Sequence, residues 1–195
     1  MSSELFRAGR AWLGGFRGGL GLASVGACGG FAAICGSSVA TAATMTQVAL
    51  PEMKRYHYDE SLATGSIAAG GTIGILIPPS VILVLYGILT ESNIGELFLA
   101  GFIPGILTIL FFMVTISIIT GIYPETGPRG AKTTFAQKMY AFKNVWSTVL
   151  LFLLVIGGIY LGFFSPEEAA GNAASGALLL ADMARTMTWK TFFDC

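Results

Sequence analysis

The fold is decided by one stretch of sequence, Gly70-Gly71-Thr72-Ile73-Gly74-Ile75-Leu76-Ile77-Pro78-Pro79-Ser80. It lies within a run, Ser61–Thr90, that contains no charged residue. Pro78 and Pro79 have no backbone N–H, and in a helix their rings collide with the carbonyl one turn back. Pro78 also disfavours a helical conformation at Ile77. The run therefore predicts a helix, a stretch of extended backbone and a second helix.

The whole chain alternates between uncharged and charged segments. Of its residues, 54% are hydrophobic and only 11% are charged, against about 25% charged in soluble domains. Four long blocks contain no charge: Gly18–Pro51, Ser61–Thr90, Leu97–Pro124 and Asn144–Pro166. Such blocks, with charges crowded between them, are typical of proteins that cross a membrane through several helices. We expect an all-α polytopic membrane protein.

The first uncharged block, Gly18–Pro51, has an unusual length. Its 34 residues are too many for one crossing and too few for two crossings with a turn, because each crossing takes about 20 residues. Gly36-Ser37-Ser38 lies in its middle, where glycine favours a turn and serine caps the helix that follows. We expect a re-entrant helical hairpin at 18–51 with its tip at these residues. A long, tilted pair of glycine-kinked helices is the alternative.

The other segments follow from charge and composition. Residues 1–17 mix three arginines with aromatic and aliphatic residues, which is typical of an interfacial helix or of the end of a longer helix. After the hairpin we expect a cytoplasmic connector at 52–60, the broken transmembrane helix at 61–90, a transmembrane helix at 97–123, a basic cytoplasmic loop at 124–143, a transmembrane helix at 144–164 and the truncated start of a second repeat at 165–195.

Lysine and arginine counts orient these segments in the membrane. Segment 1–17 carries three, the connector 52–60 two and the loop 124–143 four, whereas the turns at 91–96 and 165–168 carry none. Positive charge favours the cytoplasmic side. All three basic segments then lie on the cytoplasmic side and the two turns without lysine or arginine on the other side. This requires that the first uncharged block enters and leaves on one side, or that it crosses twice.

The hairpin tip and the helix break are candidates for one binding site. Carbonyls freed by a break are tolerated at membrane depth only where protein covers them or they line a cavity. Carbonyl and hydroxyl oxygens suit Na⁺. Helices that begin after Ser38 and after Ser80 point N–H groups and positive dipole ends into the same region, which suits a carboxylate. The oxygens on offer are the hydroxyls of Ser37, Ser38, Thr41, Thr72 and Ser80 and the carbonyls of Gly71–Ile77.

Other kinds of chemistry have little support. Cys28, Cys35 and Cys195 are too few and too poorly spaced for a zinc site, and His57 lies in the charged connector. We expect no cofactor and no metal other than Na⁺. An intramembrane enzyme is disfavoured because no Ser/His set, aspartate pair or metal-ligand set lies inside an uncharged block. A channel would need a continuous pore lining, and no basic stripe suggests nucleic-acid binding.

Several motifs resemble one transporter family. They are Gly36-Ser37-Ser38-Val39-Ala40-Thr41-Ala42-Ala43, Ala49-Leu50-Pro51-Glu52-Met53, Ala69–Ser80, Phe98-Leu99-Ala100-Gly101-Phe102-Ile103-Pro104-Gly105 and Ser165-Pro166-Glu167-Glu168-Ala169-Ala170. Together they closely resemble the large membrane subunit of TRAP (tripartite ATP-independent periplasmic) transporters, the DctM-like permease. The chain has about half the length expected for that subunit.

The resemblance implies both a fold and a function. The fold would be one half of an inverted-repeat, elevator-type transporter in the bacterial inner membrane. It would import organic acids of the C4-dicarboxylate or sialic-acid type with Na⁺ as coupling ion, together with a small membrane subunit and a periplasmic substrate-binding protein. A non-transporting membrane scaffold and an inactive fragment of the permease are the alternatives.

The resemblance also implies which residues form the site. The implied sodium ligands are Gly36, Ser37, Ser38, Gly71, Thr72, Gly74, Ile77 and Ser80, and the implied substrate contacts are Ser38, Thr41, Pro78, Pro79 and Ser80.

Overall fold

The computed structural model describes residues 2–130, 133–165, 168, 171 and 175–176, and these residues form helices and connecting turns without a strand. The chain divides into two units, Met1–Trp146 and Ser147–Cys195. The elements in order are α1 (Ser2–Leu13), α2 (Gly19–Cys35), α3 (Ser38–Arg55), α4 (Glu60–Thr72), the 3₁₀ helix η1 (Ile73–Ile75), α5 (Val81–Leu89), α6 (Ile94–Ile122) and α7 (Phe135–Tyr160). The all-α class is confirmed; the inverted repeat and the elevator mechanism stay predictions.

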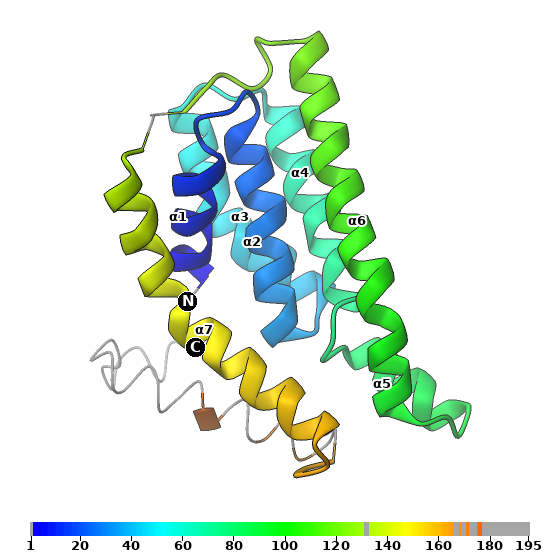
Figure 1. The fold of residues 1–195 in the computed structure, drawn as a ribbon. Helices are drawn as coiled ribbons and strands as arrows, with labels where there is room; N and C mark the ends of the chain where they lie inside the picture. The colour runs from blue at the N-terminus through cyan, green and yellow to red at the C-terminus, as the bar shows by residue number, and fades with distance from the viewer. Residues whose placement is uncertain (1, 131–132, 166–167, 169–170, 172–174, 177–195) are drawn as a thin grey trace. The chain divides into compact units, whose positions relative to one another are not determined.

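Helix α2 is the centre of the first unit. It carries no charge and is buried on nearly every face, with α1, α3, α4 and α6 packed around it (Figure 1). On one side it joins a core cluster that includes Met45 of α3 and Ile67 of α4. On another side, Val25 of α2 packs in a cluster with Ile116 of α6. A helix that is apolar all round is typical of a protein core or of a membrane span.

Helices α2 and α3 form a pair joined by a two-residue turn. Gly36 has a left-handed backbone (φ 64°), and its N–H donates to the Ala32 carbonyl, which ends α2. The Ser37 hydroxyl accepts the Ala40 N–H at 3.4 Å and so caps α3. The turn is therefore Gly36–Ser37, with Ser38 as the first residue of α3. That this pair re-enters the membrane stays a prediction.

The helical run over 61–90 is interrupted. Helix α4 ends at Thr72, η1 continues to Ile75, and α5 begins only at Val81. Between them, Pro78 and Pro79 are joined by a cis peptide bond. The helix is interrupted here because neither proline has a backbone N–H to donate to a helical hydrogen bond.

Helix α6 is long and mostly exposed. Its 29 residues extend about 44 Å at 1.5 Å per residue. Within the part of the chain that the structure describes, it is the one helix with the length and apolar composition to cross a membrane. Its apolar side chains are exposed on most of its faces, which is typical of a helix surrounded by lipid or by further helices.

Helix α1 covers most of the segment 1–17 and has two different faces. Phe6 and Ala11 are buried against the unit, whereas Arg7 and Trp12 are exposed. This amphipathic pattern is the one expected of a helix at a membrane surface, and its location there stays a prediction.

The loop after α6 crosses the end of the first unit that lies opposite the α2–α3 turn (Figure 1). We call the segment Tyr123–Gly130 the strap. Three backbone hydrogen bonds tie it to the other loops at this end: Asp59 N–H to the Thr126 carbonyl at 3.0 Å, Gly18 N–H to the Gly127 carbonyl at 2.9 Å, and Gly130 N–H to the Gly14 carbonyl at 2.9 Å.

Tyr58 joins the α3–α4 connector to the start of α2. Its side chain is buried, and its hydroxyl oxygen accepts the Leu20 N–H at 3.1 Å. Leu20 lies in the first turn of α2, where Gly18 has no side chain to supply a cap. Burial raises the pKa of Tyr58, and the bond from Leu20 partly offsets this rise.

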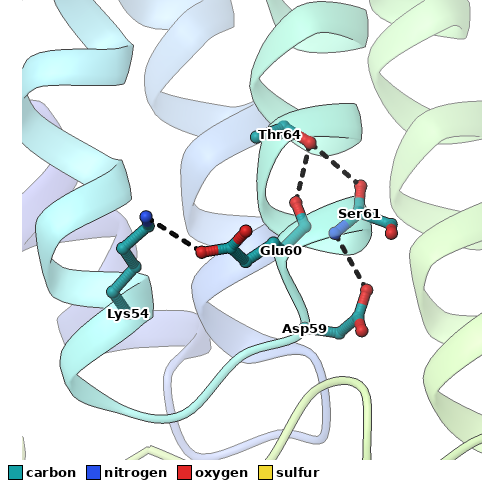
Figure 2. A network of polar contacts seen from close by, with 5 residues as sticks. All are labelled: Lys54, Asp59, Glu60, Ser61 and Thr64. Atoms are coloured by element: carbon teal, nitrogen blue, oxygen red, sulfur yellow. Dashed lines mark hydrogen bonds and ion pairs between the residues drawn. The ribbon is translucent and has the colours of Figure 1, made fainter.

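Charged side chains around the connector cap helix α4 and form an ion pair, as Figure 2 shows. The Asp59 carboxylate accepts the Ser61 N–H at 2.9 Å and so caps α4. Lys54 Nζ lies 3.0 Å from Glu60 Oε1, and both side chains are largely exposed. This end of the unit therefore keeps its charges in contact with water.

The predicted boundary between the basic loop 124–143 and a helix at 144–164 is wrong. Helix α7 begins at Phe135. The residues between Phe135 and Lys143 include neither proline nor glycine, so nothing stops the helix from starting early. An uncharged block marks the membrane core rather than the ends of a helix. The predicted second repeat at 165–195 falls almost entirely outside the described residues.

Candidate functional site

The turn between α2 and α3 lies directly against the helix break. The Val81 N–H, at the start of α5, donates to the Gly36 carbonyl at 3.2 Å. A Cβ on Gly36 would overlap the Pro79 carbonyl oxygen, and the left-handed backbone at Gly36 also favours glycine. The two segments that sequence reasoning singled out are thus in contact, and we call this region the junction.

The end of α4 and η1 pack against the start of α3. A Cβ on Gly74 would lie 2.9 Å from the carbonyl carbon and oxygen of Ser37 and 3.0 Å from the Ser38 nitrogen. A Cβ on Gly71 would lie 2.7 Å from the Ala42 Cβ. Small residues therefore allow the two backbones to approach more closely than side chains would permit.

The Ser80 hydroxyl repairs part of the helix break. It donates to the Ile75 carbonyl at 2.8 Å and accepts the Leu83 N–H at 3.4 Å, which caps α5. In an unbroken helix the Ile75 carbonyl would receive the N–H of residue 79, which is a proline. Ser80 thus satisfies a carbonyl that the proline leaves without its helical donor.

Thr41 and Ser37 hold the other side of the junction together. Thr41 is completely buried, and its hydroxyl donates to the Ser37 carbonyl at 2.7 Å. The Thr41 N–H donates to the same carbonyl at 3.0 Å. The Ser37 carbonyl therefore already has two donors, and the Gly36 carbonyl has one from α5.

The Ser38 hydroxyl differs from its neighbours. The residue is half-buried in the first turn of α3, and no hydrogen bond among the described residues involves its hydroxyl. This hydroxyl is not among the buried polar atoms that lack a partner in the described residues, so its oxygen is accessible. The Ser38 hydroxyl is therefore available to an external ligand at the junction.

The structure does not bring every predicted residue to one point. The Thr72 side chain is exposed, and its hydroxyl donates to the Ala69 carbonyl at 2.7 Å. The Ile77 side chain packs towards α6, where a Cβ on Gly105 would lie 2.8 Å from it. Pro78 is fully buried. The predicted residues linked through neighbouring contacts at the junction are Gly36, Ser37, Ser38, Thr41, Gly71, Gly74, Pro79 and Ser80.

The junction has a simple electrostatic character. Its segments contain only neutral side chains, and among the described residues no group of three histidine, cysteine or carboxylate side chains could hold a metal ion. Helices α3 and α5 both begin here, capped by Ser37 and Ser80. Their first N–H groups give the junction positive potential, while carbonyls and hydroxyls provide neutral oxygen ligands.

Sequence reasoning missed a cavity of about 380 Å³ in the first unit, away from the junction residues. It lies between α4 and α6, near the strap, and contains none of the predicted site residues. One wall comes from Ser61, Gly65 and Ala69, whose spacing of four residues places them on one face of α4. The sequence could have shown this small-residue face of α4 from its spacing. The opposite wall on α6 could not be predicted, because it depends on tertiary packing.

These features are typical of a helical membrane protein. The chain belongs to the family described as "Tripartite ATP-independent periplasmic transporter, DctM component", whose model matches residues 1–195. This confirms the family that the motifs indicated, and the family is membrane-embedded.

Relatives in several bacteria are similar over most of the chain. The C4-dicarboxylate TRAP transporter large permease protein DctM of Pseudomonas aeruginosa is 40% identical over 164 residues, covering 84% of this chain and 38% of that protein. The sialic acid TRAP transporter permease protein SiaT of Haemophilus influenzae is 35% identical over 196 residues, covering 100% and 31%. The ectoine TRAP transporter large permease protein TeaC of Halomonas elongata is 33% identical over 173 residues, covering 87% and 39%.

The chain therefore spans well under half of the length of these relatives. The relatives are transporter permeases rather than enzymes, which supports a role other than catalysis.

Proposed function

We propose that this chain is part of the large permease of a sodium-driven secondary transporter that imports small organic acids across the bacterial inner membrane. A periplasmic binding protein would deliver the substrate, and a small membrane subunit would brace the permease. The junction would form one half of the site in an inverted-repeat, elevator-type carrier, and the rest of the permease would supply the other half.

One observation carries the sodium assignment, namely the unbonded Ser38 hydroxyl beside neutral carbonyls. The hydroxyls of Ser37, Thr41 and Ser80 are all engaged by local backbone groups. Ser38 is thus the side chain at the start of α3 whose hydroxyl makes no hydrogen bond among the described residues and can turn its lone pairs towards an ion. Neutral oxygens of this kind coordinate hard monovalent cations at helix breaks in transporters.

The position of α6 supports a junction inside the membrane. Gly101 of α6 lies against the Leu76 carbonyl, and Gly105 lies against Ile77. At about 1.5 Å per residue, these glycines lie roughly 10 and 16 Å from the start of α6 at Ile94. If α6 crosses a hydrocarbon core about 30 Å thick, the junction lies within that core. This favours a re-entrant α2–α3 hairpin.

An anionic substrate fits the positive ends of α3 and α5. Among the relatives are proteins named for C4-dicarboxylate, sialic acid and isethionate. Since no lysine or arginine lies in 18–51 or 61–90, we propose that N–H groups, hydroxyls and bound Na⁺ recognise the substrate's acid group.

The junction refines the predicted residue roles. We keep Gly36, Ser37, Ser38, Gly71, Gly74 and Ser80 as the sodium-binding backbone and side-chain groups, and Ser38 and Pro79 as the substrate-facing surface. We assign Thr41, Thr72, Ile77 and Pro78 no side-chain role, because these side chains are bonded or packed elsewhere.

The test uses the full-length permease that contains this chain, purified and melted in sodium and in choline buffers. Sodium at a hundred times its Kd should stabilise the wild type by about 2.7 kcal/mol. Ser38→Ala should lose most of this increment and keep the wild-type midpoint in choline. Ser80→Ala should lower the unfolding free energy by about 1–3 kcal/mol in both buffers. The reason is that it removes the α5 cap and the partner of the Ile75 carbonyl.

A matched control comes from Thr46 on the same helix. Its exposed hydroxyl donates to the Ala42 carbonyl, so Thr46→Ala removes a hydroxyl away from the junction and should leave the sodium increment unchanged. A full increment in Ser38→Ala would contradict the proposed ligand. No increment in the wild type would favour the scaffold alternative.

A further inference from the structure

A second feature of the first unit lies at the end opposite the junction. Here the strap holds the segment that follows α1. Gly130 N–H donates to the Gly14 carbonyl, and Gly18 N–H donates to the Gly127 carbonyl, both at 2.9 Å. The Thr133 hydroxyl also donates to the Ala11 carbonyl. These bonds place Arg129, on the strap, beside the segment that carries Arg17.

Exposed aromatic side chains occur at the same end, and one of them contacts a cation. Lys138 Nζ, near the start of α7, is 5.7 Å from the centre of the Trp12 ring. Trp12 is 46% exposed and Phe16 is 62% exposed, although both are large apolar side chains. We call the set Trp12, Phe16, Arg17, Arg129 and Lys138 the basic corner. No ion pair among the described residues neutralises its three cations, and Arg17 and Arg129 are exposed.

The carboxylates at this end are mostly occupied elsewhere. Glu52 pairs with Arg10, Glu60 pairs with Lys54, and Asp59 caps α4. Glu125, on the strap, is exposed. The other end of α6 has the opposite character: the turn before it carries Glu91 and its first turn carries Glu96, without lysine or arginine.

The basic corner also lies at a defined level along α6. The strap starts where α6 ends, after Ile122, and within five residues its Gly127 carbonyl is bonded to Gly18. If α6 crosses the membrane, its end marks the level of the lipid headgroups. Exposed tryptophan and arginine at that level are typical of a surface that contacts headgroups.

We propose that the basic corner binds the phosphate headgroup of an anionic membrane phospholipid. Arg17, Arg129 and Lys138 hold the phosphate, while Trp12 and Phe16 insert beside the first acyl carbons. Charge complementarity selects this occupant: the corner joins cations to exposed aromatic surface, which matches a ligand with an anionic head and an apolar tail. The proposal depends on membrane insertion of α6 and is independent of sodium binding at the junction.

The experiment measures lipid binding to the purified full-length permease by native mass spectrometry. Phosphatidylglycerol is compared with phosphatidylcholine, and inorganic phosphate serves as a probe for headgroup binding without a tail. We expect phosphatidylglycerol to bind, phosphatidylcholine to bind at least tenfold more weakly, and phosphate alone not to compete. Each cation contributes about fivefold in affinity near an anionic surface, so the double variant R17Q/R129Q should bind phosphatidylglycerol at least tenfold more weakly.

The control variant is K54Q/R55Q, which removes the same charge at the same end but outside the basic corner. It should bind phosphatidylglycerol within twofold of the wild type. Since Arg17 and Arg129 are exposed, their replacement removes no buried contact, and an unchanged melting temperature would verify this. Unchanged binding in R17Q/R129Q, or an equal loss in K54Q/R55Q, would overturn the proposal, as would equal binding of the two lipids.

Discussion

The junction and the strap end of the first unit both join segments that are distant in sequence, but different kinds of contact hold them. At the junction, the contacts are a backbone bond from Val81 to Gly36 and neutral hydroxyl bonds from Thr41 and Ser80. At the strap end, backbone bonds are accompanied by charged caps and ion pairs such as Lys54–Glu60.

The difference follows from the surroundings that each end is proposed to have. Burying a charge away from water is far more unfavourable than burying a hydrogen-bonded neutral group. A junction within the membrane must therefore satisfy its broken helix with neutral groups, while the strap end keeps its charges hydrated. Substitutions at Gly36, at Tyr58 and in two ion pairs test this contrast, from the largest expected effect to the smallest.

Gly36→Ala should have the largest effect because it disrupts the junction directly. A left-handed alanine costs about 1–2 kcal/mol, and the overlap with the Pro79 carbonyl adds about 1–3 kcal/mol. We expect the full-length permease to lose roughly 2–5 kcal/mol of unfolding free energy. Thermal or denaturant melts measure this loss.

Gly65→Ala is the control for that change. No atom lies within 4 Å of a Cβ at this position on α4, so alanine should be neutral or stabilising by up to about 1 kcal/mol. If Gly36→Ala melts like Gly65→Ala, the α2–α3 turn does not pack against the break.

Tyr58→Phe tests the strap end at a buried polar contact. The change leaves the Leu20 N–H without a partner and should destabilise the permease by about 1–2 kcal/mol. Tyr56→Phe is the matched control, because the half-buried Tyr56 makes no hydroxyl hydrogen bond among the described residues. Equal melting of the two variants would show that Tyr58 does not cap α2.

The pH dependence of the same variant sharpens this test. Burial raises the pKa of Tyr58 above 10.0, so above that pH the unfolded chain loses the proton before the folded protein does. Wild-type stability then falls as pH rises, and Tyr58→Phe lacks this loss. The stability gap between the wild type and Tyr58→Phe should narrow above pH 10, whereas a constant gap would contradict the buried hydroxyl.

The ion pairs at the strap end should have the smallest effects. Arg10 and Glu52 lie 2.6 Å apart with side chains 39% and 30% exposed, so a double-mutant cycle with glutamine should give a coupling of about 0.5–1 kcal/mol. Lys54 and Glu60 are 55% and 76% exposed, and their coupling should be about 0.2–0.5 kcal/mol. Both values should fall in high salt; a Lys54–Glu60 coupling larger than that of Arg10–Glu52 would contradict the ranking.

Parts of the candidate site could be predicted because they depend on local chemistry. Two adjacent prolines interrupt a helix wherever they occur, and serine before a helix caps it, as Ser37 and Ser80 do. The direction of Thr72 could not be predicted, because its hydroxyl bonds within its own helix and faces outward. The early start of α7 was missed for a related reason, since charge patterns do not define helix ends.

The sequence by itself determined the helical class, the family, the break at Pro78-Pro79 and the candidate residues around it. These depend on missing N–H groups, uncharged blocks and local motifs, which act over a few residues. Only the tertiary structure decided that Gly36 meets Pro79 and Val81, that Ser38 has an unbonded hydroxyl, and that the strap gathers Arg17 and Arg129. These depend on how α2 packs among its neighbours, which involves residues too far apart in the chain for a local pattern to record.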